Sequence, residues 1–226
     1  MHEREITVAG KAPPEADELE SARARGFDVV ELYLERAHLR DVAATIETAR
    51  AAEVAVSSVH TPHVPVDEPE WLRRADRLAD ALDAYLVVHS NRIINAATPE
   101  LDRLGFRAEY GYENNPGASE RHLSSVILDR GHEFVLDTAH LYMAEQNHVE
   151  VTERLLTEYG KRINVVHLCD STLTDDGLAF EAGTMEMPAV ARVLKRKFEG
   201  VLVLEVMPDE QAAARRRLNG YWSASH

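Results

Sequence analysis

The sequence has a single cysteine, Cys169, and it lacks long apolar runs. One cysteine cannot form an internal disulfide, so apolar burial has to hold the fold together. No stretch approaches the ~18 consecutive apolar residues of a membrane-spanning helix, which argues against a membrane protein. The first residues, Met1–Glu5, are mostly charged and carry no apolar segment of the kind that directs secretion. We therefore expect a cytoplasmic protein.

Lysine is also scarce: the chain has four, namely Lys11, Lys161, Lys195 and Lys197, and its other cationic side chains are arginine or histidine. Acidic residues outnumber lysine and arginine by 39 to 25, which gives a formal net charge of −14. A surface of that sign repels phosphate backbones and disfavours nucleic acid as a partner. Acid-rich, lysine-poor surfaces also resemble those of proteins from salt-accumulating archaea. We hypothesise a haloarchaeal origin, and a stability that does not rise in molar KCl would contradict it.

Apolar residues are plentiful enough to form a core. They make up 45% of the 226 residues, an ordinary fraction for a globular protein. The length suits one α/β barrel and does not require two domains. Because the chain shows no low-complexity segment or linker, we predict a single domain over residues 1–226.

Short β-branched runs alternate with helical patterns along the whole chain, which is typical of a parallel sheet. The runs are Ile6–Ala9, Asp28–Leu34, Val54–His60, Tyr85–His89, Arg107–Glu113, Phe134–Asp137, Asn164–Leu168 and Val201–Val206. The expected helices run up to Arg25, over Leu39–Ala49, over Trp71–Leu82, after Thr98-Pro99, and over Ser119–Arg130, Val149–Tyr159, Met187–Arg196 and Asp209–Leu218. Eight such units predict a closed (β/α)₈ TIM barrel, with a doubly wound open sheet as the alternative.

Polar side chains gather where these predicted strands end. In an α/β barrel the loops after the strands form the mouth that carries the chemistry. The residues at those positions are Glu31, His60, His89, Glu113, Asp137 with His140, His167 with Asp170, and Glu205. A carboxylate that ends an apolar strand such as Val201–Glu205 is costly to bury unless it is paired or bound to a metal.

Each of these residues alone has an ordinary structural explanation. A single histidine at a strand end is more often hydrogen-bonded structure than a ligand, and a single glutamate at a barrel rim is usually solvated. Together they would make a strongly anionic mouth. Two or three carboxylates with one imidazole form a site for a divalent ion, and Mn²⁺, Mg²⁺, Co²⁺ and Zn²⁺ are all chemically reasonable.

The order of the motifs resembles the xylose-isomerase-like TIM barrel superfamily. The matching residues are Glu113-Asn114, Asp137-Thr138 with His140, His167-Leu168 with Asp170, and Glu205, and the resemblance begins at Gly26-Phe27. That superfamily includes sugar phosphate isomerases and epimerases, inosose dehydratase-type enzymes, and endonuclease IV, the AP endonuclease family 2.

The resemblance implies a metal site made of Glu113, Asp137, His167 and Glu205. It also implies that Glu113 and Glu205 flank the substrate carbon and exchange its proton. His140 would then contact substrate oxygens, and Asp170 would orient His167 or the substrate. Further contacts to substrate or to an additional metal are expected from His60, His89, Asp170 and Glu31. A homodimer is expected from the resemblance alone.

The chemistry agrees with a metal-dependent isomerase or epimerase acting on a sugar or polyol. A divalent ion that chelates adjacent carbonyl and hydroxyl oxygens acidifies the neighbouring C–H, and a carboxylate can then take and return the proton. Ketose 3-epimerases carry an arginine shortly after the histidine of the seventh strand, and none follows His167 here. The substrate therefore stays open.

Two alternatives remain. An endonuclease IV-like nuclease would use His60 and His89 as further zinc ligands, but its Asp-x-His motif is Asp176-Gly177-Leu178 in this chain. A barrel that binds a metal or a polyol without turnover is the third hypothesis.

Overall fold

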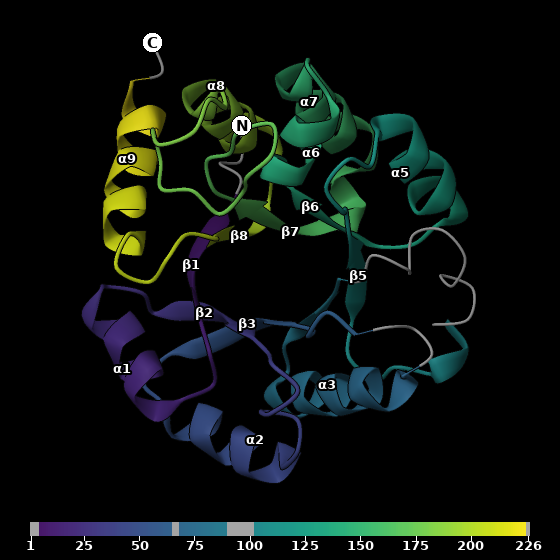
Figure 1. Cartoon of the computed structure of the whole chain (residues 1–226), viewed down its shortest axis with the longest axis vertical. Helices are drawn as coiled ribbons and strands as arrows, with labels where there is room; N and C mark the ends of the chain where they lie inside the picture. The colour runs from purple at the N-terminus through teal and green to yellow at the C-terminus, as the bar shows by residue number, and fades with distance from the viewer. Residues whose placement is uncertain (1–4, 65–67, 90–101, 225–226) are drawn as a thin grey trace.

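Eight parallel strands form a closed barrel in a computed structural model that describes residues 5–64, 68–89 and 102–224. The strands follow one another in chain order, and β8 pairs with β1 to close the ring. Figure 1 shows the helices around the outside of this ring. The predicted (β/α)₈ TIM barrel is therefore confirmed, and the open sheet is excluded.

The strand bounds are β1 Ile6–Ala12, β2 Val29–Tyr33, β3 Ala55–His60, β4 Tyr85–Val88, β5 Tyr110–Glu113, β6 Phe134–Asp137, β7 Ile163–Leu168 and β8 Gly200–Leu204. The α-helices are α1 Ala16–Ala24, α2 Val42–Ala51, α3 Pro69–Leu82, α5 Glu120–Val126, α6 Thr138–Ala144, α7 His148–Tyr159, α8 Met187–Lys197 and α9 Gln211–Ser223. Short 3₁₀ turns cover η2 Asp102–Leu104, η3 Leu128–Arg130 and η4 Gly160–Arg162. The helix expected after Thr98-Pro99 would begin within residues 90–101, which lie outside the described residues. No helix in the described ranges is long and apolar enough to cross a membrane.

Two strand boundaries differ from the prediction by three residues, and the others by two or fewer. The first strand continues past Ala9 because Gly10, Lys11 and Ala12 pair with β2, and this carries Lys11 to the mouth of the barrel. The fifth strand starts at Tyr110 and not at Arg107. The backbone N–H groups of Arg107 and Ala108 donate to the Asp76 side chain, at 2.8 and 3.0 Å, so they do not join the ladder.

Among the helices, α9 ends five residues after its predicted end at Leu218, and two others differ in kind. The sequence pattern missed α6, which begins directly after Asp137 because that carboxylate caps it by accepting from the backbone N–H of His140 at 2.8 Å. The helix expected over Ser119–Arg130 ends at Val126 and continues as the 3₁₀ turn η3. Gly131, with a φ of 85°, then ends the turn in a left-handed conformation that glycine adopts without strain.

Alternation along the strands separates the core into two parts. The barrel interior is filled by Ala9, Tyr85, Val87, Val135, Val165 and Val203, whereas their neighbours along each strand pack outward against the helices. Because side chains alternate with a period of two, the residue two positions after an inward-facing one also faces inward. This rule places the site, because the residues two positions after the interior layer also face inward and lie at the mouth of the barrel.

Candidate active site

The polar residues at the mouth continue the inward-facing rows of the barrel. His167 follows Val165 by two positions, Asp137 follows Val135, and Glu205 follows Val203, and all three valines lie in the barrel interior. The sequence therefore places an apolar layer inside the barrel and a polar layer directly above it, at the carboxyl ends of the strands.

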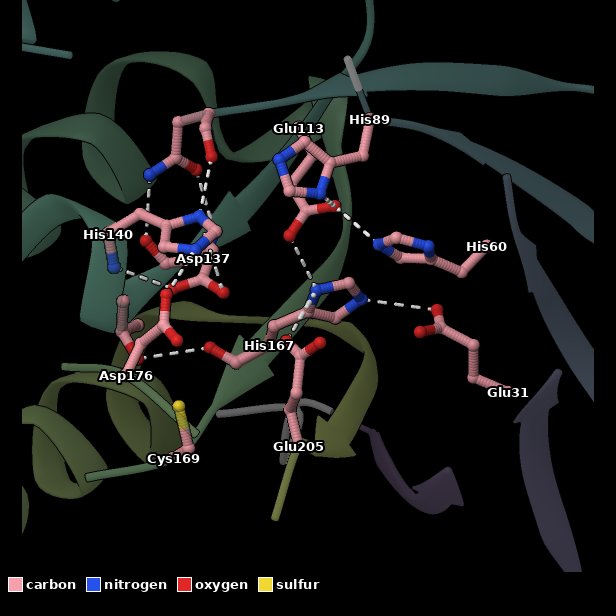
Figure 2. Close-up of polar contacts among 12 residues, drawn as sticks. Glu31, His60, His89, Glu113, Asp137, His140, His167, Cys169, Asp176 and Glu205 are labelled. Atoms are coloured by element: carbon pink, nitrogen blue, oxygen red, sulfur yellow. Dashed lines mark hydrogen bonds and ion pairs between the residues drawn. The ribbon is translucent and has the colours of Figure 1, made fainter. Parts of the chain in front are cut away.

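Four side chains converge in this polar layer. Glu113, Asp137, His167 and Glu205 each offer one ligand atom, and these atoms all lie within 4.8 Å of one another. His167 Nδ1 lies 2.9 Å from Glu113 Oε1 and 3.0 Å from Glu205 Oε2. Figure 2 shows the carboxylates of Glu113 and Glu205 directed toward the His167 ring. The structure thus brings together the four residues that the family resemblance implied as metal ligands.

The orientation of His167 suits a metal ligand. Its Nε2 lies 3.1 Å from Glu31 Oε2 (Figure 2), and because an ionised carboxylate only accepts hydrogen bonds, Nε2 carries a proton. When a cation replaces the proton on Nδ1, the lone pair of this nitrogen points toward Glu113 and Glu205. A carboxylate behind the histidine and a free nitrogen in front are typical of metal-bound imidazoles. Imidazole and carboxylate donors in this number fit a divalent ion such as Mn²⁺, Mg²⁺, Co²⁺ or Zn²⁺.

Without a cation, the same geometry makes His167 a strong base. Burial would lower its pKa, but the carboxylates of Glu31, Glu205 and Glu113 outweigh burial and raise the pKa of His167 well above its usual value. Lone pairs of three acceptors face one point here, so a proton or a metal ion has to lie between them. A divalent ion supplies twice the charge of a proton at that point.

Asn114 and Thr138 hold the ends of the ligand-bearing strands in register. The Asn114 side chain donates to the carbonyl of Asp137 and accepts from its backbone N–H, both at 2.8 Å. Thr138 Oγ1 donates to the carbonyl of His167 at 3.0 Å. These residues of the Glu-Asn and Asp-Thr motifs therefore fix the spacing between Glu113, Asp137 and His167.

Glu31 lies behind His167, away from the cavity. Its side chain is completely buried and accepts from Ser58 Oγ at 2.8 Å as well as from His167. Burial alone would raise the pKa of Glu31, but His167 and Lys11 outweigh it and lower the pKa to about 2. Glu31 is not among the described residues of the cavity wall, and it contacts His167 and Lys11. A contact of Glu31 with substrate or an additional metal stays a prediction.

Lys11 is a site residue that the sequence reasoning missed. It pairs in register with Glu31, and its ammonium contacts Glu205 Oε1 and lies 3.2 Å from Glu31 Oε1. Burial would lower the pKa of Lys11, but Glu205, Glu31 and Glu113 raise it above its usual value, so the amine stays protonated. Once pairing with β2 extends the first strand through Lys11, the alternation that turns Ala9 inward also turns Lys11 inward.

His60 and His89 contact the opposite side of Glu113. His60 Nε2 lies 2.9 Å and His89 Nδ1 3.3 Å from Glu113 Oε2, and these three residues form a second group with metal-ligand spacing. His60 Nδ1 lies 2.9 Å from the carbonyl of Thr61, so both ring nitrogens of His60 face groups that accept hydrogen bonds. Burial is the main cause that lowers the pKa of His89 to about 4, which keeps this ring neutral.

His140 is held as a cation. Its Nδ1 lies 2.7 Å from the carbonyl of Asn114 and its Nε2 2.9 Å from Asp176 Oδ2, and both partners accept hydrogen bonds. Burial would lower the pKa of His140, but Asp137 and Asp176 outweigh it and raise the pKa to about 10. Burial is also the main cause that raises the pKa of Asp137, with Glu205 and Glu113 adding to it.

The Asp170 carboxylate binds backbone groups of a loop and makes no hydrogen bond to His167 among the described residues; its contact with substrate stays a prediction. It is buried, and Oδ1 accepts from the backbone N–H groups of Ser171 and Met185 while Oδ2 accepts from those of Glu181 and Gly183. Its role is to organise the loop between β7 and α8. That loop carries Asp176 to His140.

A cavity of about 300 Å³ opens above the polar layer. Its walls are formed by Lys11, Tyr33, Leu34, His60, Thr61, His63, His89, Asp137, His140, Cys169, Asp176, Gly177 and Glu205. Glu113 and His167 are 1% and 0% exposed and lie beneath this wall, whereas the Glu205 side chain is 25% exposed. The size suits a small polar molecule, and Glu205 is the most exposed of the three ligand carboxylates, since Asp137 and Glu113 are almost fully buried.

Comparison with known proteins supports the same fold. The sequence profile of the xylose isomerase-like TIM barrel family matches residues 34–220. No curated protein matches the chain in sequence. Among solved structures, a D-tagatose 3-epimerase-like protein superposes with a TM-score of 0.74 at 21% identity, covering 95% of this chain and 97% of its own.

Two further structures show how wide this group is. A D-allulose 3-epimerase from Methylomonas sp. gives a TM-score of 0.72 at 16% identity, covering 96% of this chain and 98% of its own. An AP endonuclease, family 2, from Brucella melitensis superposes with a TM-score of 0.68 at 13% identity, covering 95% of this chain and 98% of its own. At these identities the likeness shows the fold and leaves the reaction open.

Proposed function

This chain belongs to the xylose isomerase-like TIM barrel family, and we propose that it is a divalent-metal-dependent isomerase or epimerase of a small sugar or polyol. The observation that carries the proposal is the convergence of the Glu113, Asp137, His167 and Glu205 ligand atoms within 4.8 Å, next to a cavity of about 300 Å³. Family membership and epimerase neighbours support the same reaction class.

The same four residues would hold the metal. When bound, the divalent ion polarises the carbonyl and hydroxyl oxygens of the sugar and so acidifies the adjacent C–H. Glu31 holds the His167 ring with Nδ1 forward, and Asn114 fixes the Asp137 backbone. The chain thus supplies a pre-organised ligand set, which is the condition for a tightly defined substrate position.

Glu205 and Glu113 would exchange the proton. Glu205 lines the cavity and can reach a bound substrate directly. Glu113 is buried, but His60 and His89 contact its Oε2 and line the cavity themselves, so an imidazole can carry a proton between Glu113 and the substrate. Return of the proton from the opposite face gives epimerisation, and return to the neighbouring carbon gives isomerisation.

His140 would bind substrate oxygens from the opposite wall. It is an imidazolium whose Nε2 proton is shared with Asp176, a residue 44% exposed in its side chain. A sugar hydroxyl entering the cavity can accept from this nitrogen in place of Asp176. The absence of an arginine after His167 distinguishes the chain from ketose 3-epimerases, so we expect a substrate outside their usual set.

The test is solvent isotope exchange. Metal-free protein reloaded with Mn²⁺, Co²⁺ or Mg²⁺ is incubated in D₂O with a sugar panel that includes D-allulose, D-tagatose and D-fructose, and products are followed by NMR. Proton transfer at carbon predicts deuterium in the product, and Glu205→Gln should abolish it. Failure of every sugar and polyol in a broad panel to exchange a C–H would refute the proposed reaction.

A second candidate, a zinc-dependent abasic-site nuclease, is favoured by one specific observation. His60, His89 and Glu113 form a further group with metal-ligand spacing, as an additional zinc site requires. Two features oppose it: Leu178 stands where that branch has a histidine, and the net charge of −14 repels DNA.

Metal stoichiometry separates the two functions. Elemental mass spectrometry of the wild type and a His60→Ala/His89→Ala variant would show about one ion per chain in both if the isomerase proposal holds. Two or more zinc ions that disappear in the variant would favour the nuclease. An abasic-DNA cleavage assay at high salt would then decide.

A further inference from the structure

The ammonium of Lys11 lies at the edge of the ligand set. It contacts Glu205 Oε1, while the other oxygen of the same carboxylate, Oε2, lies 3.0 Å from His167 Nδ1. Lys11 is therefore one carboxylate group away from the point where the four ligand atoms converge. Its side chain is 10% exposed, and it forms part of the cavity wall.

Lys11 differs from every other residue of that wall. Among the described residues that line the cavity it is the one lysine or arginine, and the remaining polar side chains are carboxylates, histidines, a threonine, a tyrosine and a cysteine. An ammonium has three N–H donors and no acceptor. Glu31 and Glu205 take two of them, which leaves one donor without a partner among the residues that the structure describes.

We propose that Lys11 donates its remaining hydrogen to an oxygen of the sugar substrate and holds that oxygen beside the carbon that loses its proton. This inference rests on the proposed isomerase or epimerase function and adds a substrate-binding residue to it. Negative charge grows on the oxygen next to a carbon as its proton leaves, and a fixed cation in a site shielded from water stabilises that charge.

The alternative is that Lys11 only neutralises Glu31 and Glu205. Both carboxylates are buried or half-buried near His167, and a counter-ion would lower the cost of keeping them charged. The two roles make opposite predictions. If Lys11 is only a counter-ion, its loss alters metal binding or folding. If it donates to the substrate, its loss weakens sugar binding and leaves the metal in place.

The experiment compares Lys11→Met, which keeps the apolar stem but removes every donor, with Lys11→Gln, which keeps an N–H donor without the charge. Lys161→Met is the matched control, since Lys161 is exposed on the η4 turn that precedes β7, at the other end of the barrel. For each protein, metal content is measured by elemental mass spectrometry and folding by thermal melting. Binding is measured by calorimetry on the Mn²⁺-loaded form, with the same broad panel of sugars and polyols that serves for the exchange test.

We expect Lys11→Met to retain the metal and the fold but to bind the sugar at least tenfold more weakly than the wild type. Lys11→Gln should recover part of the lost sugar affinity. Lys161→Met should bind like the wild type. Sugar binding unchanged in Lys11→Met, or metal lost together with sugar in both Lys11 variants, would overturn the inference. If the wild type binds a sugar but shows no C–H exchange, the proposed reaction fails while the binding role of Lys11 stands. If it binds none, both fail.

Discussion

Replacement of Glu31 by glutamine tests whether a buried residue outside the cavity controls the metal site. Glu31 is 0% exposed and binds three groups: His167 Nε2 at 3.1 Å, Ser58 Oγ at 2.8 Å, and the Lys11 ammonium at 3.2 Å. Glutamine keeps the shape and can still accept from Nε2. It removes the charge that fixes the tautomer of His167 and raises the basicity of its Nδ1.

The expected magnitude follows from these contacts. A hydrogen bond to a charged group contributes about 1.5–3 kcal/mol. Loss of the residue behind a metal-bound histidine typically weakens metal binding by about 10- to 100-fold, which corresponds to about 1.4–2.8 kcal/mol. The two ranges agree, so Glu31→Gln should bind Co²⁺ or Zn²⁺ about 10- to 100-fold more weakly than the wild type.

The assay is a competition titration of metal-free protein against a chelator of known affinity at fixed pH. Asp176→Asn is the matched control, because it removes one carboxylate from the same mouth without touching His167. Its effect should be at most about threefold, since Asp176 is 44% exposed and solvent screens its charge. An affinity of folded Glu31→Gln equal to that of the wild type would refute the argument that Glu31 orients His167.

Three further predictions follow from other parts of the site. Glu205→Gln should abolish turnover and weaken metal binding in the same titration, because it removes both a ligand and a proton acceptor; full activity would contradict the two-carboxylate mechanism. Asp170→Ala leaves four backbone N–H groups without their acceptor, two buried and two part-buried, and should lower the free energy of unfolding by at least about 2 kcal/mol in a denaturant titration. A cost below about 1 kcal/mol would mean that the loop does not depend on this carboxylate. His140 holds its proton more tightly in the folded state, where its pKa is about 10, than at the ordinary pKa of 6.5. Its contribution to the free energy of unfolding is therefore complete below pH 6.5 and is lost as the pH rises through about 10. In metal-free protein the wild type should therefore lose more stability between pH 7 and 10 than His140→Gln does, and parallel pH profiles would contradict the ion pairs of His140 with Asp176 and Asp137.

Much of the ligand set could be predicted because it depends on local pattern. Apolar runs with a period of two, each ending in a polar residue, fix which side chain faces inward at the end of a strand. This holds for Asp137 after Val135, His167 after Val165 and Glu205 after Val203. Once the barrel closes, these ends meet at one mouth, so the convergence of the four ligands follows from the fold.

Other features could not be read from one segment at a time. The first strand extends through Lys11 only because β2 provides hydrogen-bond partners for Gly10–Ala12. The α6 helix begins where it does because the Asp137 carboxylate caps it. In both cases a contact with another part of the chain, or a side chain already placed by a strand, overrides the local propensity of the sequence.

The sequence by itself determined the fold class and the residue types at the mouth, because periodicity and strand order do not depend on distant contacts. Only the tertiary structure decided what each residue faces. It placed Glu31 behind His167, turned Asp170 into the β7–α8 loop, paired His140 with Asp176 and set Lys11 against Glu205. These pairings join residues up to 194 positions apart, and they are fixed by the closure and register of the barrel.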